Sequence, residues 1–209
     1  MSILQHLLEN NINWSKKVKA ERPRFFSDLA KQQKPEYVWI GCSDSRISAS
    51  NIVGLLPGDI FVHRNVANQV IHTDLNCLSV LQFAIEVLKV KHAIVCGHYG
   101  CGGVIAAFED KRHGLIDNWL GIFKIRQIFT SEFSTNLKTN KKIDKLCELN
   151  VIEQVMNVEA MTIVQEAWER GQNLIVHGWI YSIEDGSISD LDASLENEAA
   201  RKILRKRFL

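Results

Sequence analysis

The sequence predicts an α/β protein with a mostly parallel four-stranded sheet core flanked by helices and preceded by an N-terminal helical extension. Three observations support this fold class. Short runs rich in β-branched residues alternate with segments of helical periodicity, and parallel strands need such crossover connections. The 209 residues are 46% apolar, which is enough to fill one sizeable core. Residues 1–34 carry apolar positions at helical spacing, ahead of the first strand-like run.

The elements follow in chain order. Residues 1–34 form a helical arm, in which Pro23 interrupts the apolar stripe that includes Leu4 and Leu7. Residues 35–190 form the α/β domain, and residues 191–209 form a helical tail with a basic end. The polar stretch 111–150 is expected to be helical with loops and to form a solvated connecting surface rather than an interface. Within the domain we expect strands at 37–42, 59–64, 91–98 and 173–181, and helices over 73–89, from about 101, and over 151–170.

Composition excludes several classes of partner. The net charge is +1 with both signs mixed along the chain, so neither nucleic acid nor an anionic membrane surface is expected to bind. No window approaches the roughly 18 apolar residues of a membrane span. The five cysteines are odd in number, and the first residues lack the features of a signal peptide. We therefore expect a cytoplasmic protein with reduced cysteines.

Two motifs rich in reactive side chains follow predicted strands. GCSDSR (41–46) ends the first strand, and GHYGCGG (97–103) ends the third. Ligands of open parallel sheets collect outside the carboxyl ends of the strands, especially where neighbouring connections diverge. If these two strands are neighbours in the sheet, the two motifs form one site.

The two motifs together offer the ligand set of one metal ion. Cys42, His98 and Cys101, with Asp44 nearby, supply two thiolates, an imidazole and a carboxylate. This set favours zinc, because an iron–sulfur cluster would use four thiolates. We expect one zinc ion per chain.

Asp44 has two possible partners, and the choice decides what the site does. Asp44 as a permanent fourth ligand would close the site, whereas three protein ligands leave a position for a reactive water. Arg46 lies close enough in the sequence to bind both oxygens of the Asp44 carboxylate and keep it off the metal. Zinc lowers the pKa of bound water from 15.7 to about 7, and two thiolate ligands should weaken this shift. We therefore expect activity to rise on the alkaline side.

The motifs CxDxR at residues 42–46 and HxxC at 98–101 resemble those of the β-class carbonic anhydrases, in particular a bicarbonate-regulated, bacterial-type subset. The similarity extends over about residues 1–188 and includes 63–70, 76–88 and 177–186. It implies a zinc enzyme that hydrates carbon dioxide reversibly to bicarbonate and a proton through zinc-bound hydroxide. Cys42, His98 and Cys101 would hold the zinc, and Asp44 and Arg46 would be the catalytic pair.

The resemblance also implies an assembly and two pockets. Members of the family form dimers, often paired into tetramers, so residues 1–34 would be a dimerisation arm. A small substrate pocket would be lined by Gln33, Phe61, Val66, Phe83 and Gly102. A second pocket would bind bicarbonate through Trp39, Gly41, Arg64 and Tyr181. Bicarbonate bound there would separate Asp44 from Arg46, so that Asp44 ligates zinc and inactivates the enzyme.

Other functions compete with this one. The same scaffold could hydrolyse carbon disulfide or carbonyl sulfide, or serve as a non-catalytic bicarbonate sensor whose zinc site Asp44 keeps closed. A cysteine phosphatase is excluded, because its phosphate loop needs a longer span than the three residues between Cys42 and Arg46.

Overall fold

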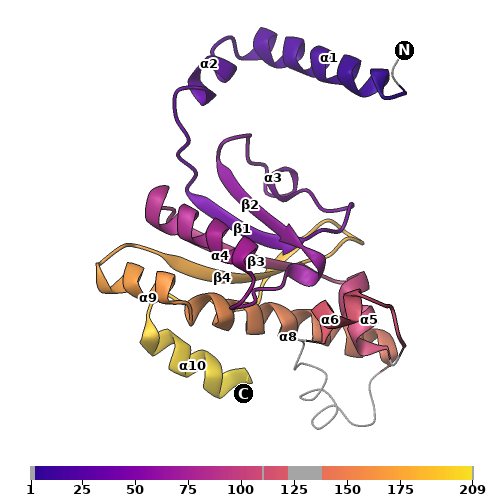
Figure 1. Cartoon of the computed structure of the whole chain (residues 1–209), viewed down its shortest axis with the longest axis vertical. Coiled ribbons are helices and arrows are strands. Elements are labelled where there is room, and N and C mark those ends of the chain that lie inside the picture. Colours follow the sequence, from indigo (N-terminus) through magenta and orange to yellow (C-terminus); the bar gives the residue numbers. More distant parts are fainter. Residues whose placement is uncertain (1–2, 110, 122–137, 209) are drawn as a thin grey trace. The chain divides into compact units, whose positions relative to one another are not determined.

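The computed structural model describes residues 3–109, 111–121 and 138–208, and the chain divides into two compact units, Met1–Lys34 and Pro35–Leu209 (Figure 1). The first unit contains α1 (Gln5–Glu21) and α2 (Phe25–Leu29), which confirms helices on either side of Pro23. The ring of Trp14 in α1 packs edge-on against Phe26 in α2, with 5.6 Å between the ring centroids. No residue of α1 is buried, so this helix leaves apolar surface exposed within its unit.

The second unit is built on a five-stranded sheet with the order β2-β1-β3-β4-β5. The first four strands of this order are parallel, as the sequence predicts, and β5 pairs antiparallel with β4. The sequence did not predict β5, because its three residues are too few for a hydrophobic pattern and none is buried. The strands are β1 (Tyr37–Cys42), β2 (Ile60–Asn65), β3 (His92–His98), β4 (Ile175–Tyr181) and β5 (Ile188–Asp190).

One face of the sheet carries the larger part of the core. The side chains of Val38, Ile40 and Val95 pack there with buried residues of the longer helices. The opposite face holds a smaller cluster around Trp39, Ile94 and Cys96, partly covered by α3 (Ala49–Ile52). The larger face is covered by α4 (Leu75–Gln82), α5 (Gly102–Phe108), α8 (Thr139–Glu159) and α9 (Thr162–Glu169).

The predicted helix over 151–170 proves to be two helices. The chain leaves the helical conformation at Met161, so α8 ends at Glu159 and α9 starts at Thr162. The first half of α8 also corrects the prediction of a solvated connection over 111–150, because Leu146 and Asn150 are buried there. A helix that buries one apolar stripe keeps polar residues on its other side. In this helix the polar residues outnumber the apolar ones, so the buried stripe was not recognised. Residues 122–137 lie outside the described part of the chain.

The remaining elements are short. The predicted helix over 73–89 is α4 followed by a π-helical turn, Phe83–Val87, and a 3₁₀ turn, Val66–Asn68, follows β2. Two further helices are α6 (Ile116–Leu120) and α10 (Glu198–Phe208). In α10, which lies within the predicted tail, Arg201 pairs with buried Glu159 of α8 at 3.0 Å. In the described part of the chain, no helix combines the length and the apolar character that crossing a membrane requires.

Helix α8 lies along β3 and β4 (Figure 1), and this close approach depends on glycine. A Cβ atom on Gly97 in β3 would lie 2.5 Å from Cγ2 of Val151 in α8. Gly97 immediately precedes His98, so the packing of α8 also fixes the end of β3 that enters the site.

We predict that Gly97→Ala lowers the free energy of unfolding by about 1 to 3 kcal/mol, because the added methyl group overpacks the contact with Val151. Urea unfolding at a fixed protein concentration measures the change. In the double variant with Val151→Ala, the loss of unfolding free energy should be smaller than the sum of the losses in the two single variants, because the smaller side chain makes room for the methyl group. Fully additive losses would show that this contact does not set the distance between helix and sheet.

Candidate metal centre

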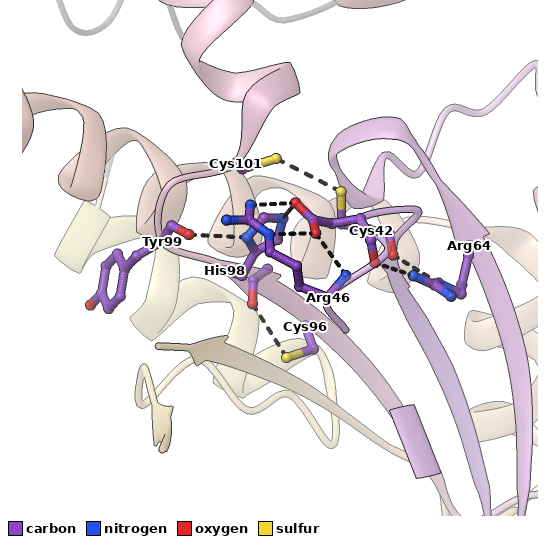
Figure 2. A network of polar contacts seen from close by, with 9 residues as sticks. Cys42, Arg46, Arg64, Cys96, His98, Tyr99 and Cys101 are labelled. Carbon is purple, nitrogen blue, oxygen red and sulfur yellow. Dashed lines mark hydrogen bonds and ion pairs between the residues drawn. The ribbon is translucent and has the colours of Figure 1, made fainter. Parts of the chain in front are cut away.

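The two motifs meet because β1 and β3 are neighbouring parallel strands. Gly41 of β1 is paired with Cys96 of β3, so both strands end at the same edge of the sheet. Cys42 is the last residue of β1, His98 is the last residue of β3, and Cys101 directly precedes α5. Figure 2 shows the side chains of these three residues converging from the two strand ends.

The three predicted ligands form one buried cluster. The sulfur atoms of Cys42 and Cys101 are 3.8 Å apart. One ligand atom from each cysteine and from His98 lies within 4.8 Å of the others, and all three residues are buried. All five cysteines of the chain are free. The arrangement therefore brings together the two thiols and the imidazole that the sequence assigned to one metal ion.

His98 shows most directly that this cluster fits a metal. Its Nδ1 lies 3.0 Å from the carbonyl oxygen of Tyr99, to which it donates in one ring tautomer. That tautomer leaves a lone pair on Nε2, which is buried and has no hydrogen-bond partner. A buried imidazole nitrogen without a partner, beside two thiols, matches a zinc ligand whose second nitrogen is fixed by a carbonyl.

Backbone donors tune the Cys42 sulfur. Hydrogen bonds from the Cys101 thiol and from the backbone N–H groups of Ala67 and Asp44 lower the pKa of the Cys42 thiol. The hydrogen bond that the Cys101 thiol donates to Cys42, together with burial, raises the pKa of the Cys101 thiol. The thiolate form of Cys42, which is the form that binds a metal, is thus stabilised by the protein itself.

Asp44 and Arg46 form the predicted ion pair. Arg46 Nε donates to Oδ1 of Asp44 at 2.9 Å, and Nη2 donates to Oδ2 at 2.7 Å. The backbone N–H of Arg46 donates to Oδ1 as well, at 3.0 Å. These bonds from Arg46 hold the pKa of the Asp44 carboxyl well below its usual range. Asp44 Oδ2 lies 3.8 Å from Nε2 of His98, so the ionised carboxylate borders the ligand cluster.

Arg64 makes a contact that the sequence did not predict. Its Nε donates to the carbonyl oxygen of Cys42 at 2.8 Å, and its Nη2 donates to the carbonyl oxygen of Asp44 at 2.6 Å (Figure 2). One guanidinium on β2 therefore fixes the backbone on both sides of Ser43. Backbone acceptors carry no sequence signal, and the contact also depends on the pairing of Arg64 with Gly41 across the strands.

The four residues predicted for a bicarbonate pocket lie near the same end of the sheet. The Trp39 indole covers Gly41, where a Cβ atom would collide with the ring. Trp39 and Tyr181 pack into the smaller cluster of the core. Gly41 is paired with Arg64 in β2, whereas Tyr181 is paired with His98 and so lies on the far side of β3 from β1.

The residues predicted for the substrate pocket lie in several elements. The rings of Phe61 and Phe83 stack with 5.9 Å between centroids. Val66 and Phe83 are 37% and 44% exposed, so they offer apolar surface to solvent. Gly102 is the first residue of α5. Gln33 belongs to the first unit, and its role stays a prediction.

Sequence reasoning missed a group of buried amide side chains that support the loop beside Cys42. Side-chain amides of Gln69, Asn150 and Gln154 form a buried hydrogen-bonded group next to the loop after β2. The available signal was the spacing of Asn150, Gln154 and Asn157, which places three amides on one stripe of a helix.

Comparison with known proteins agrees with the site. A family model described as carbonic anhydrase matches residues 37–188. A carbonic anhydrase of Emericella nidulans is 42% identical over 187 residues, which cover 89% of this chain and 82% of the relative. The crystal structure of the β-carbonic anhydrase CafA of Aspergillus fumigatus has a TM-score of 0.88 and 39% identity, with 99% of each chain covered.

A tetrameric β-carbonic anhydrase of Sordaria macrospora has a TM-score of 0.87 and 37% identity, with 92% of this chain and 98% of that chain covered. These three similar proteins come from fungi. Membership of the bacterial-type subset therefore stays a prediction.

Proposed function

We propose that this chain, which belongs to the β-class carbonic anhydrases, hydrates carbon dioxide reversibly to bicarbonate and a proton under the control of Asp44. One observation supports control of the activity by Asp44. Arg46 binds both oxygens of the Asp44 carboxylate, yet Oδ2 of Asp44 lies only 3.8 Å from Nε2 of His98. Zinc held by Cys42, His98 and Cys101 would supply the Lewis acid that makes water nucleophilic at neutral pH. The protein supplies the remaining functions.

In the active arrangement, Arg46 keeps Asp44 away from the metal ligands. The carboxylate stays ionised beside the cluster, since Arg46 lowers its pKa. An ionised carboxylate only accepts hydrogen bonds, so Asp44 can accept one from the attacking water and direct the oxygen lone pair toward the substrate. The exposed surface of Val66 and Phe83 supports an apolar wall for carbon dioxide.

In the inactive arrangement, Asp44 would leave Arg46 and would join Cys42, His98 and Cys101 in holding the zinc ion. Arg64 is suited to control this change, because it binds the carbonyl oxygens of Cys42 and Asp44 and so fixes the loop. Bicarbonate is an oxyanion that would compete with these carbonyls for the guanidinium, and Trp39 and Tyr181 could offer further donors. Loss of the Arg64 bonds would release the loop and with it the ion pair between Asp44 and Arg46.

Self-association is part of the proposal. Leu4, just before α1, and Leu7 and Leu8 in α1 are each more than half accessible to solvent, and an exposed apolar stripe of this kind favours a protein interface. The similar enzyme of Sordaria macrospora is described as tetrameric. We propose a dimer or tetramer of this chain in the cytoplasm.

We predict that Asp44→Asn retains about one zinc per chain but hydrates carbon dioxide about a hundredfold more slowly. An uncharged amide accepts a hydrogen bond from water more weakly than a carboxylate does, and it cannot form the ion pair. Stopped-flow hydration between pH 6.5 and 9, with zinc measured on the same samples, tests this. Asp59→Asn is the control, since Asp59 also caps a loop through a backbone N–H, at 2.9 Å. Normal turnover of Asp44→Asn would show that the ion pair is only structural.

The same measurement on the unaltered protein separates carbonic anhydrase activity from the alternatives. Zinc near one per chain without hydration at any pH would favour a sensor whose site is closed. Hydrolysis of carbon disulfide or carbonyl sulfide, in the absence of carbon dioxide hydration, would favour that chemistry instead.

We predict that Tyr181→Phe weakens inhibition by bicarbonate by about tenfold in concentration, because the phenol no longer donates a hydrogen bond to the anion. Each variant is compared with its own rate without bicarbonate, so a change in basal rate does not affect the result. Tyr37→Phe is the matched control, since Tyr37 lies at the opposite end of the sheet, stacked on His92. Equal inhibition of both variants and of the unaltered protein would contradict a bicarbonate pocket at Tyr181.

A further inference from the structure

We propose that the side-chain amides of Gln69, Asn150, Gln154 and Asn157, here called the amide chain, are positioning residues for the Cys42 metal ligand. The amide chain connects α8 to the loop that follows β2, and that loop starts at Asn65, which is paired with Cys42 across the two strands. The inference rests on the zinc centre described above and is independent of the Asp44 switch.

The amide chain binds the carbonyl oxygen of Ala67 with two donors. Gln69 Nε2 donates to it at 2.8 Å, and Asn150 Nδ2 donates to it at 3.0 Å. The Asn150 oxygen in turn accepts from Gln69 Nε2 at 2.8 Å and from Gln154 Nε2 at 3.0 Å. Gln69, Asn150 and Gln154 are each no more than 2% exposed, so water does not compete for these bonds.

The far end of the loop is fixed by the same group. Gln154 Oε1 accepts the backbone N–H of Val70 at 2.8 Å, and Asn157 Nδ2 donates to the Val70 carbonyl oxygen at 3.2 Å. Asn157 also donates to Gln154 Oε1 at 3.1 Å. Every member of the amide chain therefore bonds both to the loop or its end and to another member.

The loop needs such support because its backbone is strained. Ala67 and Asn68 have φ angles of 63° and 47°, in the left-handed region that side chains other than glycine rarely adopt. The loop forms only a short 3₁₀ turn, Val66–Asn68, in which Ala67 departs from helical geometry. A strained backbone conformation persists where surrounding contacts hold it, and here the two amide hydrogen bonds to the Ala67 carbonyl oxygen do so.

The consequence for the metal centre follows from Asn65, where the loop leaves β2. Asn65 is paired with Cys42, and its carbonyl oxygen accepts the backbone N–H of Ser43 at 2.9 Å. Its side-chain oxygen accepts the backbone N–H of Gln69 at 2.6 Å, so the position of the loop helps to set the position of Cys42. The loop also borders α5, since a Cβ atom on Gly103 would lie 2.8 Å from Cγ1 of Val66. Loss of the amide chain should therefore change the Cys42 ligand itself, beyond any loss of stability.

The experiment compares Gln69→Met with Gln165→Met in the full chain, each loaded with cobalt(II) in place of zinc. Both substitutions preserve side-chain length and remove two amide donor bonds, since Gln165 Nε2 donates to the carbonyl and carboxylate oxygens of Glu159 at 2.6 and 2.8 Å. Gln165 serves as the control because Glu159 lies about 13 Å from Asn150 along α8. The readouts are the thiolate-to-cobalt charge-transfer absorption, zinc affinity by chelator competition, and thermal unfolding.

We expect Gln69→Met to shift the charge-transfer band and to weaken zinc binding by about tenfold, whereas Gln165→Met lowers only the unfolding temperature. If Gln69→Met does not fold, Gln154→Met, which removes three bonds of the amide chain, is measured instead, with the same expectation. An unchanged band and affinity in the amide-chain variant, or equal changes in the control, would overturn the proposal. Because no readout involves turnover, the result is independent of the proposed control by Asp44.

Discussion

The ion pair between Asp44 and Arg46 is the interaction on which the chemistry of the site depends. Three hydrogen bonds from one residue, two from the guanidinium and one from the backbone, occupy both oxygens of the carboxylate. They keep Asp44 ionised and hold it beside His98 without direct hydrogen bonding. A carboxylate placed in this way has two alternative partners within reach, a cation and a metal site. In the proposed switch, movements of the loop around Ser43 would decide between these two partners.

The fold makes this arrangement possible by placing β1 between β2 and β3 in the sheet. The connection from β1 leads to β2 on one side, and the chain then returns to β3 on the other side. Open parallel sheets bind ligands at such a point, where neighbouring connections diverge. One strand end here supplies a thiol and the ion pair, and the next supplies the imidazole and the second thiol. Arg64 from β2 then fixes the carbonyl oxygens of the loop between them.

Most of the sheet and the ligand set could be predicted from the sequence, because both leave local patterns. The run YVWIGC gives the first strand with its observed limits, Tyr37–Cys42, and the two motifs predict the ligands of one metal ion. Two features could not be predicted. The bonds of Arg64 go to backbone carbonyls, and the amide chain joins residues more than eighty positions apart in sequence. Such contacts depend on strand register and helix position, which one sequence does not specify.

Two crystal structures of the zinc-loaded protein at alkaline pH, one without and one with bicarbonate, test the central claim most directly. Without bicarbonate, we expect Asp44 to bind Arg46 through both oxygens, at about the 2.7 and 2.9 Å seen here, with no bond to the metal. With bicarbonate, we expect the anion near Arg64, the ion pair broken and Asp44 bound to zinc. An ion pair that stays intact in both structures, with bicarbonate bound at Arg64, would contradict the account of one carboxylate with two partners.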